Sequence, residues 1–306
     1  ATPVMALSMD EYLVPAVVTV AAVVVAYRML SERSSPRELA RLLRGSQSPL
    51  QTCNLSTMLA TKHAGKFDAR MIQREPPGLV LNPSDVGECC SRVESIVGTS
   101  SPSIHDSLDR CLNQIADLSK LKAHVEELRS TPYDSANPTH EAGLEKLWTL
   151  LQPGRERDGG RVSKDWADVG FQGLDPASDF RGMGFFALLT LLHLAEHHGD
   201  FCRKHIEIYM KPGNELRYYP FAITSINVTG WVIEQLRNGV FDECLLERNC
   251  HVDALHTIHY ALFRHFSATW DRVNPKSVME FSTIQRLSLQ EAKAMGPRKL
   301  LKAYSL

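Results

Sequence analysis

The sequence predicts an all-α fold, a multi-helix bundle, from three observations. Apolar residues recur at three- and four-residue steps in several segments, which is the spacing of one face of a helix. No segment shows the clear two-residue alternation of a half-buried strand. Residues 183–198 are apolar on nearly all faces, which is typical of a helix in a protein interior. A chain of 306 residues can hold one domain of about 200 residues and an N-terminal extension.

Residues 1–44 are predicted to form a hydrophobic, transmembrane-like anchor helix with a basic flank. The run from Tyr12 to Tyr27 is uncharged and rich in valine and alanine. Arginines follow it at Arg28, Arg33, Arg37, Arg41 and Arg44. A spanning helix needs about 20 apolar residues, so the length is marginal. Asp10 and Glu11 precede the run, where a signal peptide carries positive charge. A buried or interfacial helix and a cleaved signal remain as alternatives.

The charge distribution also predicts where the rest of the chain lies. Arginines after an apolar segment mark its cytosolic side, so an N-terminal anchor would leave the C-terminal part facing the cytosol of a membrane-associated protein. The seven cysteines are scattered and odd in number, which indicates a reducing compartment. A net charge of −1 provides no basic field, so nucleic acid is not expected as a partner.

Residues 45–103 are predicted to be a partly disordered linker, and residues 104–306 a helical domain. The linker is rich in serine, proline, glycine and charge, with two short helices expected near 56–66 and 87–97. The domain begins with a long amphipathic helix over 104–128. A second helix is expected with Thr139 as its cap, and its predicted buried face comprises Leu144, Leu147, Trp148 and Leu151.

The later elements are assigned by the same spacing. A charged loop at 153–164 leads to residues 166–184, and the apolar helix 183–198 follows. Residues 201–210 fit a short helix, whereas 219–236 are ambiguous because many of them are β-branched. Apolar residues at helical steps predict helices over 255–270 and 278–287, with a basic tail after them.

The sequence lacks the residue patterns that several common enzymatic reactions require. The phosphate-binding pattern Gly-x-x-x-x-Gly-Lys-Ser/Thr and the nucleophile pattern Gly-x-Ser-x-Gly do not occur, so neither GTP binding by this chain nor serine hydrolysis is expected. His193 and His197 lie four residues apart, as metal ligands on a helix can. The His-Glu-x-x-His order is missing and twelve histidines produce such spacings by chance, so no metal site is predicted. A metalloenzyme stays a minor alternative.

Residues 166–184 form the most informative stretch, because they place Arg181 in an unusual setting. Glycines supply backbone freedom at Gly170, Gly173, Gly182 and Gly184, and aromatic residues at Trp166, Phe171 and Phe180 are expected to pin the loop to a core. Asp175-Pro176 reads as a turn, and Ser178 or Asp179 is expected to cap a helix that begins at Arg181. A fixed, partly exposed guanidinium suits phosphate recognition. The alternative is an ion pair with Asp175, Asp179 or Glu196 that fastens the loop.

This stretch resembles the signature of the ELMO-domain family, in which a tryptophan leads into Gly-Phe-Gln-Gly, Asp-Pro and Asp-Phe-Arg-Gly-Met-Gly. Leu144-Glu-Lys-Leu-Trp148 and Tyr219-Pro-Phe-Ala-Ile-Thr-Ser-Ile-Asn227 fit the same pattern, so the resemblance extends over residues 104–300. Ser178 stands where threonine is usual, and Phe185 and Phe186 stand where smaller or aliphatic residues are common. The resemblance implies a GTPase-activating protein for small GTPases of the Arf and Arf-like group.

The resemblance also implies roles for individual residues. Arg181 matches the catalytic arginine of the family. Loop organisation or partner contact falls to Trp166, Gly170, Phe171, Gln172, Gly173, Asp175, Pro176, Asp179, Phe180, Gly182 and Gly184. Gln172 is expected to brace the loop rather than to orient the attacking water, because small GTPases often supply their own glutamine. GTP and magnesium belong to the partner, so this chain needs no cofactor. The alternative function is a scaffold that binds a small GTPase or its regulatory complex without catalysis.

Overall fold

The structure is a computed structural model that describes Ser84, residues 86–87, Ser91, and residues 102–210 and 218–304. Throughout these residues the regular elements are helices and no strand occurs, which confirms the all-α prediction. The predicted anchor over 1–44 lies outside the described residues, and so does the linker over 45–103 apart from the few residues named above. In the part of the chain that is described, no helix combines the length and apolar character needed to span a bilayer.

The chain divides into two compact units. One comprises residues up to Leu121 together with Asp242–Cys250, and the other comprises Lys122–Phe241 and His251–Leu306. Helix α5 (Pro102–Ser130) runs without interruption through the boundary at Leu121, in agreement with the helix predicted over 104–128. In the first unit, the short helix α10 (Asp242–Glu247) buries Cys244, Leu245 and Leu246.

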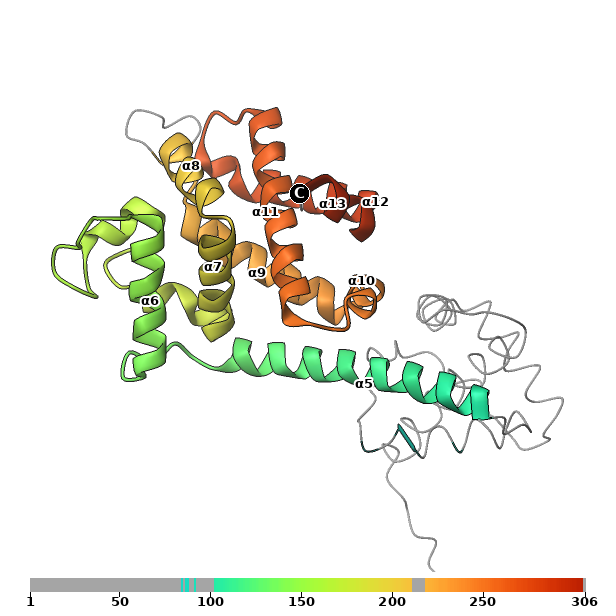
Figure 1. Ribbon diagram of the computed structural model, residues 1–306. Coiled ribbons are helices and arrows are strands. Elements are labelled where there is room, and N and C mark those ends of the chain that lie inside the picture. The colour runs from blue at the N-terminus through green and yellow to red at the C-terminus, as the bar shows by residue number, and fades with distance from the viewer. Residues whose placement is uncertain (1–83, 85, 88–90, 92–101, 211–217, 305–306) are drawn as a thin grey trace, which may run out of the picture. The chain divides into compact units, whose positions relative to one another are not determined.

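The core of the second unit is built around α7 (Gly184–His197). This helix packs against α6 (Pro138–Leu151), α9 (Phe221–Arg237) and α11 (Val252–Val273), and Figure 1 shows it between α6 and α11. Phe186, Leu188 and Leu191 are fully buried on it. A helix with neighbours on several sides must be apolar on several faces, which explains why the sequence of α7 lacks a polar stripe.

Helix α9 resolves the ambiguous segment 219–236. The segment is helical from Phe221 to Arg237, and its chain reverses at Gly239, where φ is 68°. Val228, Val232 and Ile233 are buried on it. A β-branched residue costs only a few tenths of a kcal/mol in helix propensity, whereas burying its side chain contributes about 1.5–3 kcal/mol, so tertiary packing decides the conformation.

Three further helices complete this unit. The predicted short helix at 201–210 is α8 (Gly199–Tyr209). The predicted helix at 278–287 corresponds to η5 (Val278–Glu280) and α12 (Phe281–Met295). The predicted basic tail is instead helical as α13 (Pro297–Tyr304), because Leu300 and Leu301 bury one face of it and the helix packs on α11.

The prediction that Thr139 caps the second helix is wrong. The side chain of Asn137 accepts a hydrogen bond from the Thr139 backbone N–H at 2.9 Å, and Pro138 occupies the first helical position. Proline suits this position because its missing N–H would have no partner inside the helix. The cap therefore lies two residues before the threonine.

Buried histidines make the second unit sensitive to acid. Burial lowers the pKa of His205 and of His256 to about 3 and that of His259 to about 4. The unfolded chain, with histidine pKa near 6.5, binds these protons more tightly than the folded protein. The free energy of unfolding is therefore not reduced by these histidines above pH 6.5. It falls as the pH drops towards 4, by up to about 1.4 kcal/mol per pH unit for each histidine.

We expect the urea midpoint of unfolding to decrease steeply between pH 6.5 and pH 5. In the His259→Gln variant the slope of this decrease should be smaller, since one of the three groups no longer titrates. Substitution of the exposed Gln290 by alanine is the control and should retain the wild-type slope, because it removes no titrating group. A midpoint independent of pH across this range would contradict the prediction.

Candidate functional site

Arg181 lies on an exposed turn in front of α7. Residues 164–184 form the 3₁₀ helices η3 (Lys164–Val169) and η4 (Pro176–Gly182), and η4 packs against α7 and α9. The predicted cap at Ser178 or Asp179 is wrong, because the Asp175 side chain caps η4 by accepting from the Ala177 N–H at 3.0 Å. Arg181 therefore stands in the last turn of η4, and α7 begins only at Gly184.

The guanidinium of Arg181 is exposed and forms no ion pair with a described carboxylate, although its charge acts on the nearby Asp179. Its Nε donates to the Ser178 carbonyl at 2.7 Å, which fixes one edge of the guanidinium. Among the described residues, its two terminal nitrogens have no hydrogen-bond or ion-pair partner. A planar fork with two donors directed to solvent can bind two oxygens of a phosphate group.

The three carboxylates considered as internal partners of Arg181 are engaged elsewhere. Asp175 pairs with Arg161 at 2.5 Å. Glu196 pairs with Lys146. Asp179 accepts the Gln172 backbone N–H at 2.8 Å. The ion pair that would have fastened the loop through Arg181 is thus not formed in the structure.

Asp179 closes the glycine loop onto η4. Burial raises the pKa of its carboxyl, while the Gln172 N–H and the charge of Arg181 act in the opposite direction. The hydrogen bond to Asp179 comes from the backbone of Gln172, and the Gln172 side chain is exposed. The loop is therefore held by the backbone of Gln172 and the side chain of Asp179.

Two glycines of the loop are required by close backbone contacts. Gly170 has φ +88°, a Cβ there would collide with the backbone N of Phe221, and its carbonyl accepts from Ile223 N at 3.1 Å. Gly184 has φ +55°, and a Cβ there would collide with the carbonyl oxygen of Arg129. These contacts attach the loop to the start of α9 and the end of α5. Gly182 and Gly173 have open space around them.

Aromatic side chains form the floor of the loop. Trp166, Phe171 and Phe180 are buried, and their rings meet edge to face with centroids 5.5 Å apart for the first pair and 5.7 Å for the second. Pro176 is also buried. Because Phe180 is turned into this floor with 1% exposure, its neighbour Arg181 is directed outwards. Edge-to-face pairs of this kind contribute about 0.5–1.5 kcal/mol each beyond their buried area.

The charged segment 153–164 braces the loop, a role that sequence reasoning missed. Arg161 pairs with the capping Asp175, and its carbonyl accepts from the Trp166 indole N–H at 2.6 Å. Arg157 lies 4.3 Å from the centre of the Trp166 ring. The signal available in the sequence was a cluster of arginines directly before a tryptophan. Such a cluster can stack on the aromatic ring as well as remain in solvent.

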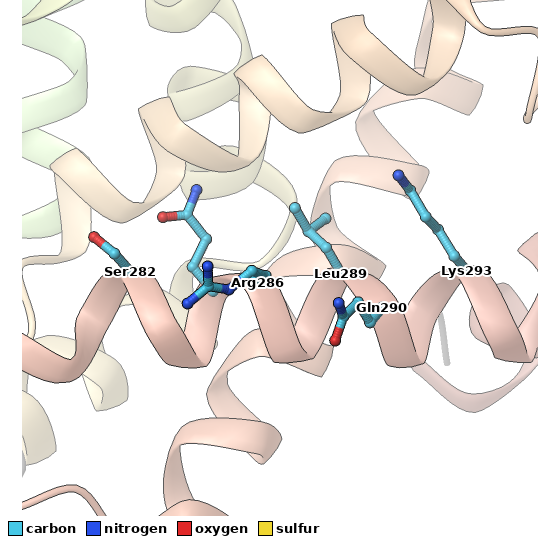
Figure 2. A pocket seen from close by; sticks show the side chains of 6 residues that line it. Ser282, Arg286, Leu289, Gln290 and Lys293 are labelled. Carbon is cyan, nitrogen blue, oxygen red and sulfur yellow. The ribbon is translucent and has the colours of Figure 1, made fainter.

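A hollow elsewhere on the surface does not involve this loop. It lies along one face of α12 and is lined by Ser282, Gln285, Arg286, Leu289, Gln290 and Lys293. Figure 2 shows these side chains projecting from a single helix. One helix face offers no converging polar groups for a small ligand, so we do not assign a ligand site to it.

The histidines noted in the sequence stack with one another. The ring centres of His193 and His197 are 4.0 Å apart, and those of His193 and His256 are 4.2 Å apart. Within the described residues, no group of three or more histidine, cysteine or acidic side chains could hold a metal ion. Rings stacked in parallel direct their nitrogens sideways instead of towards a common centre.

A sequence model of a known family covers most of the helical domain and the whole arginine loop. The sequence model of the ELMO/CED-12 family matches residues 123–285, a segment that includes Arg181. The chain therefore belongs to the ELMO/CED-12 family.

Several similar proteins are named after the ELMO domain. ELMO domain-containing protein B of Dictyostelium discoideum is 36% identical over 180 residues, which cover 59% of this chain and 62% of that protein. ELMO domain-containing protein 1 of Mus musculus is 36% identical over 204 residues, 60% of this chain and 62% of that protein. ELMO domain-containing protein 2 of Bos taurus is 30% identical over 218 residues, which cover 69% of this chain and 73% of that protein. The chain thus spans about three fifths of the first two relatives. No solved structure matches the chain.

Proposed function

We propose that this protein is a GTPase-activating protein for a small GTPase of the Arf or Arf-like group and that Arg181 is its arginine finger. The observation that carries the proposal is the exposed guanidinium of Arg181, fixed at Nε while its terminal nitrogens lack a partner among the described residues. Family membership supports a role alongside small GTPases. The specific group of GTPases comes from the motif resemblance.

The chemistry takes place on the partner's nucleotide. When GTP is hydrolysed, negative charge shifts towards the oxygens between the β- and γ-phosphates, and a guanidinium placed there stabilises the transition state. Inserted arginines of this kind accelerate hydrolysis by about 10³–10⁵-fold. A rigid loop raises the benefit, because less side-chain and loop entropy is lost when the arginine enters the site. The partner supplies GTP and magnesium.

The decisive experiment measures single-turnover hydrolysis by a panel of Arf and Arf-like proteins preloaded with GTP, with and without this chain. We expect strong acceleration for at least one GTPase. Binding without acceleration for every member of the panel would instead indicate the non-catalytic scaffold.

Asp179 acts in this proposal as a positioning residue. In the Asp179→Ala variant the Gln172 N–H loses its acceptor, and we expect kcat to decrease about tenfold with little change in KM, because the loop beside Arg181 loosens. The Asp179→Asn variant retains an oxygen acceptor and should recover most of the rate. Equal losses in both variants would indicate that the negative charge matters rather than the hydrogen bond.

We also propose that residues 1–44 anchor the protein to a membrane with the helical domain in the cytosol, where a GTPase partner is accessible. The support is the uncharged run from Tyr12 to Tyr27 followed by arginines. Alkaline carbonate extraction of membranes should leave the full chain in the pellet, and deletion of residues 1–44 should release it. Release of the full chain by carbonate would contradict the anchor.

A further inference from the structure

Two exposed apolar residues lie on neighbouring backbone segments at the arginine loop. In the described part of the chain, the large hydrophobic residues with high exposure are Val162, Leu174, Val273 and Met279. Val162 and Leu174 are 47% and 55% exposed. The Ser163 N–H donates to the Leu174 carbonyl at 2.9 Å, so the two segments run side by side at this point. We refer to Val162 and Leu174 as the apolar pair.

The apolar pair is connected to Arg181 through η4. Leu174 directly precedes Asp175, the cap of η4. Ser178 donates from its backbone N–H and its hydroxyl to the Asp175 carbonyl at 3.2 and 3.0 Å, and Arg181 donates in turn to the Ser178 carbonyl. Five residues of 3₁₀ helix rise about 10 Å and the two extended residues before them span at most about 7 Å, so Leu174 and Arg181 are separated by about 17 Å or less.

This separation is small compared with a protein interface. A standard interface covers about 800 Å² on each partner, which corresponds to a disc about 30 Å across. One interface of this size can therefore include both Arg181 and the apolar pair.

The charged residues next to the apolar pair neutralise each other, which favours an apolar occupant over a charged one. Arg161 directly precedes Val162 and Asp175 directly follows Leu174, and these two residues form an ion pair at 2.5 Å. Gly173 and Gly182 add exposed backbone without side chains, and a Cβ at either position would find nothing within 4 Å. This protein leaves the space beside both glycines empty, so the backbone of a partner can approach them closely.

We propose that the apolar pair is the docking contact for the switch segments of the GTP-bound partner. This inference rests on the proposed function. If Arg181 reaches the γ-phosphate, the neighbouring partner surface consists of the segments that the γ-phosphate and its magnesium order. Those segments meet the apolar pair only in the GTP state, so the pair contributes selectivity for GTP over GDP as well as affinity.

The proposal separates binding from chemistry, which a steady-state measurement can resolve. The full chain is assayed with increasing concentrations of the most responsive GTP-loaded GTPase. We expect Leu174→Asp and Val162→Asp each to raise KM at least tenfold, with kcat within twofold of wild type, because a buried unpaired carboxylate opposes docking. Arg181→Lys should show the reverse pattern. Met279→Asp is the matched control, since Met279 is 87% exposed on η5, and should retain both constants.

Each outcome is informative. Wild-type KM in both Leu174→Asp and Val162→Asp would overturn the proposal. Should a variant lose its helical circular dichroism, Leu174→Gln replaces it with a smaller perturbation and the same expected direction. If the wild-type chain accelerates no GTPase, binding to GTPases loaded with a non-hydrolysable GTP analogue is measured. Binding that Leu174→Asp weakens and Met279→Asp retains would uphold the docking contact although the catalytic proposal fails, and absence of any wild-type binding would overturn both.

Discussion

Arg181→Lys is expected to abolish nearly all acceleration of GTP hydrolysis, a loss of about 10³-fold or more in kcat at saturating protein. Lysine retains the positive charge but replaces a planar fork of donors by a single ammonium group on a flexible stem. In the structure, the fork is oriented by the Nε hydrogen bond to Ser178, which lysine lacks the atom to reproduce. Charge alone at this position should therefore be insufficient.

The fold and docking should be preserved in this variant. Arg181 is exposed and no described carboxylate depends on it as an ion-pair partner, so the free energy of unfolding should change by less than about 0.5 kcal/mol. Arg286→Lys, an exposed arginine on α12, is the matched control and should retain the full rate. A folded Arg181→Lys or Arg181→Ala protein with wild-type activity would refute the arginine-finger mechanism.

The sequence predicted the helical core well where one physical signal dominates. Apolar spacing located α5 and α11, and the continuous apolar composition identified α7 as an interior helix. It failed to resolve α9, because β-branched residues favour strands locally and only the surrounding helices make a helix the better solution. The basic tail was not predicted as a helix because its only buried residues, Leu300 and Leu301, are adjacent and show no helical spacing.

Helix caps were harder to predict than helices. Thr139, Ser178 and Asp179 all have suitable side chains, yet Asn137 and Asp175 form the caps. Both true caps directly precede a proline. The restricted conformation of a residue before proline is extended, as a cap residue requires, so the Asn-Pro and Asp-Pro pairs held the information.

The sequence predicted which residues form the site but not the contacts that hold them in place. The sequence indicated that Arg181 stands in a glycine-rich, aromatic loop, and the structure places it on an exposed turn above buried aromatic rings. Which glycines are indispensable depends on residues distant in sequence, such as Phe221 opposite Gly170. The same holds for the pairing of Asp175 with Arg161, which leaves Arg181 without a carboxylate partner.

Gly184→Ala is expected to destabilise the protein by about 2–5 kcal/mol. The positive φ of +55° costs a non-glycine residue about 1–2 kcal/mol, and overpacking against rigid atoms typically adds about 1–3 kcal/mol. The atoms that a Cβ would meet are the carbonyl oxygens of Arg129 and Thr131, which belong to the backbone and cannot rotate aside. The Phe185 N–H also donates to the Thr131 carbonyl at 2.8 Å, so movement of α7 would sacrifice this bond.

The measurement is the free energy of unfolding from urea titrations, with Gly182→Ala as the matched control two residues away. A Cβ at Gly182 meets nothing within 4 Å and its φ is not in the left-handed region, so its stability should change by less than about 0.5 kcal/mol. Equal stability of Gly184→Ala and wild type would mean that α7 can begin without the close contact to the end of α5. That contact holds the start of α7, directly after the turn that carries Arg181. If it is dispensable, the rigid presentation of the arginine finger needs another cause.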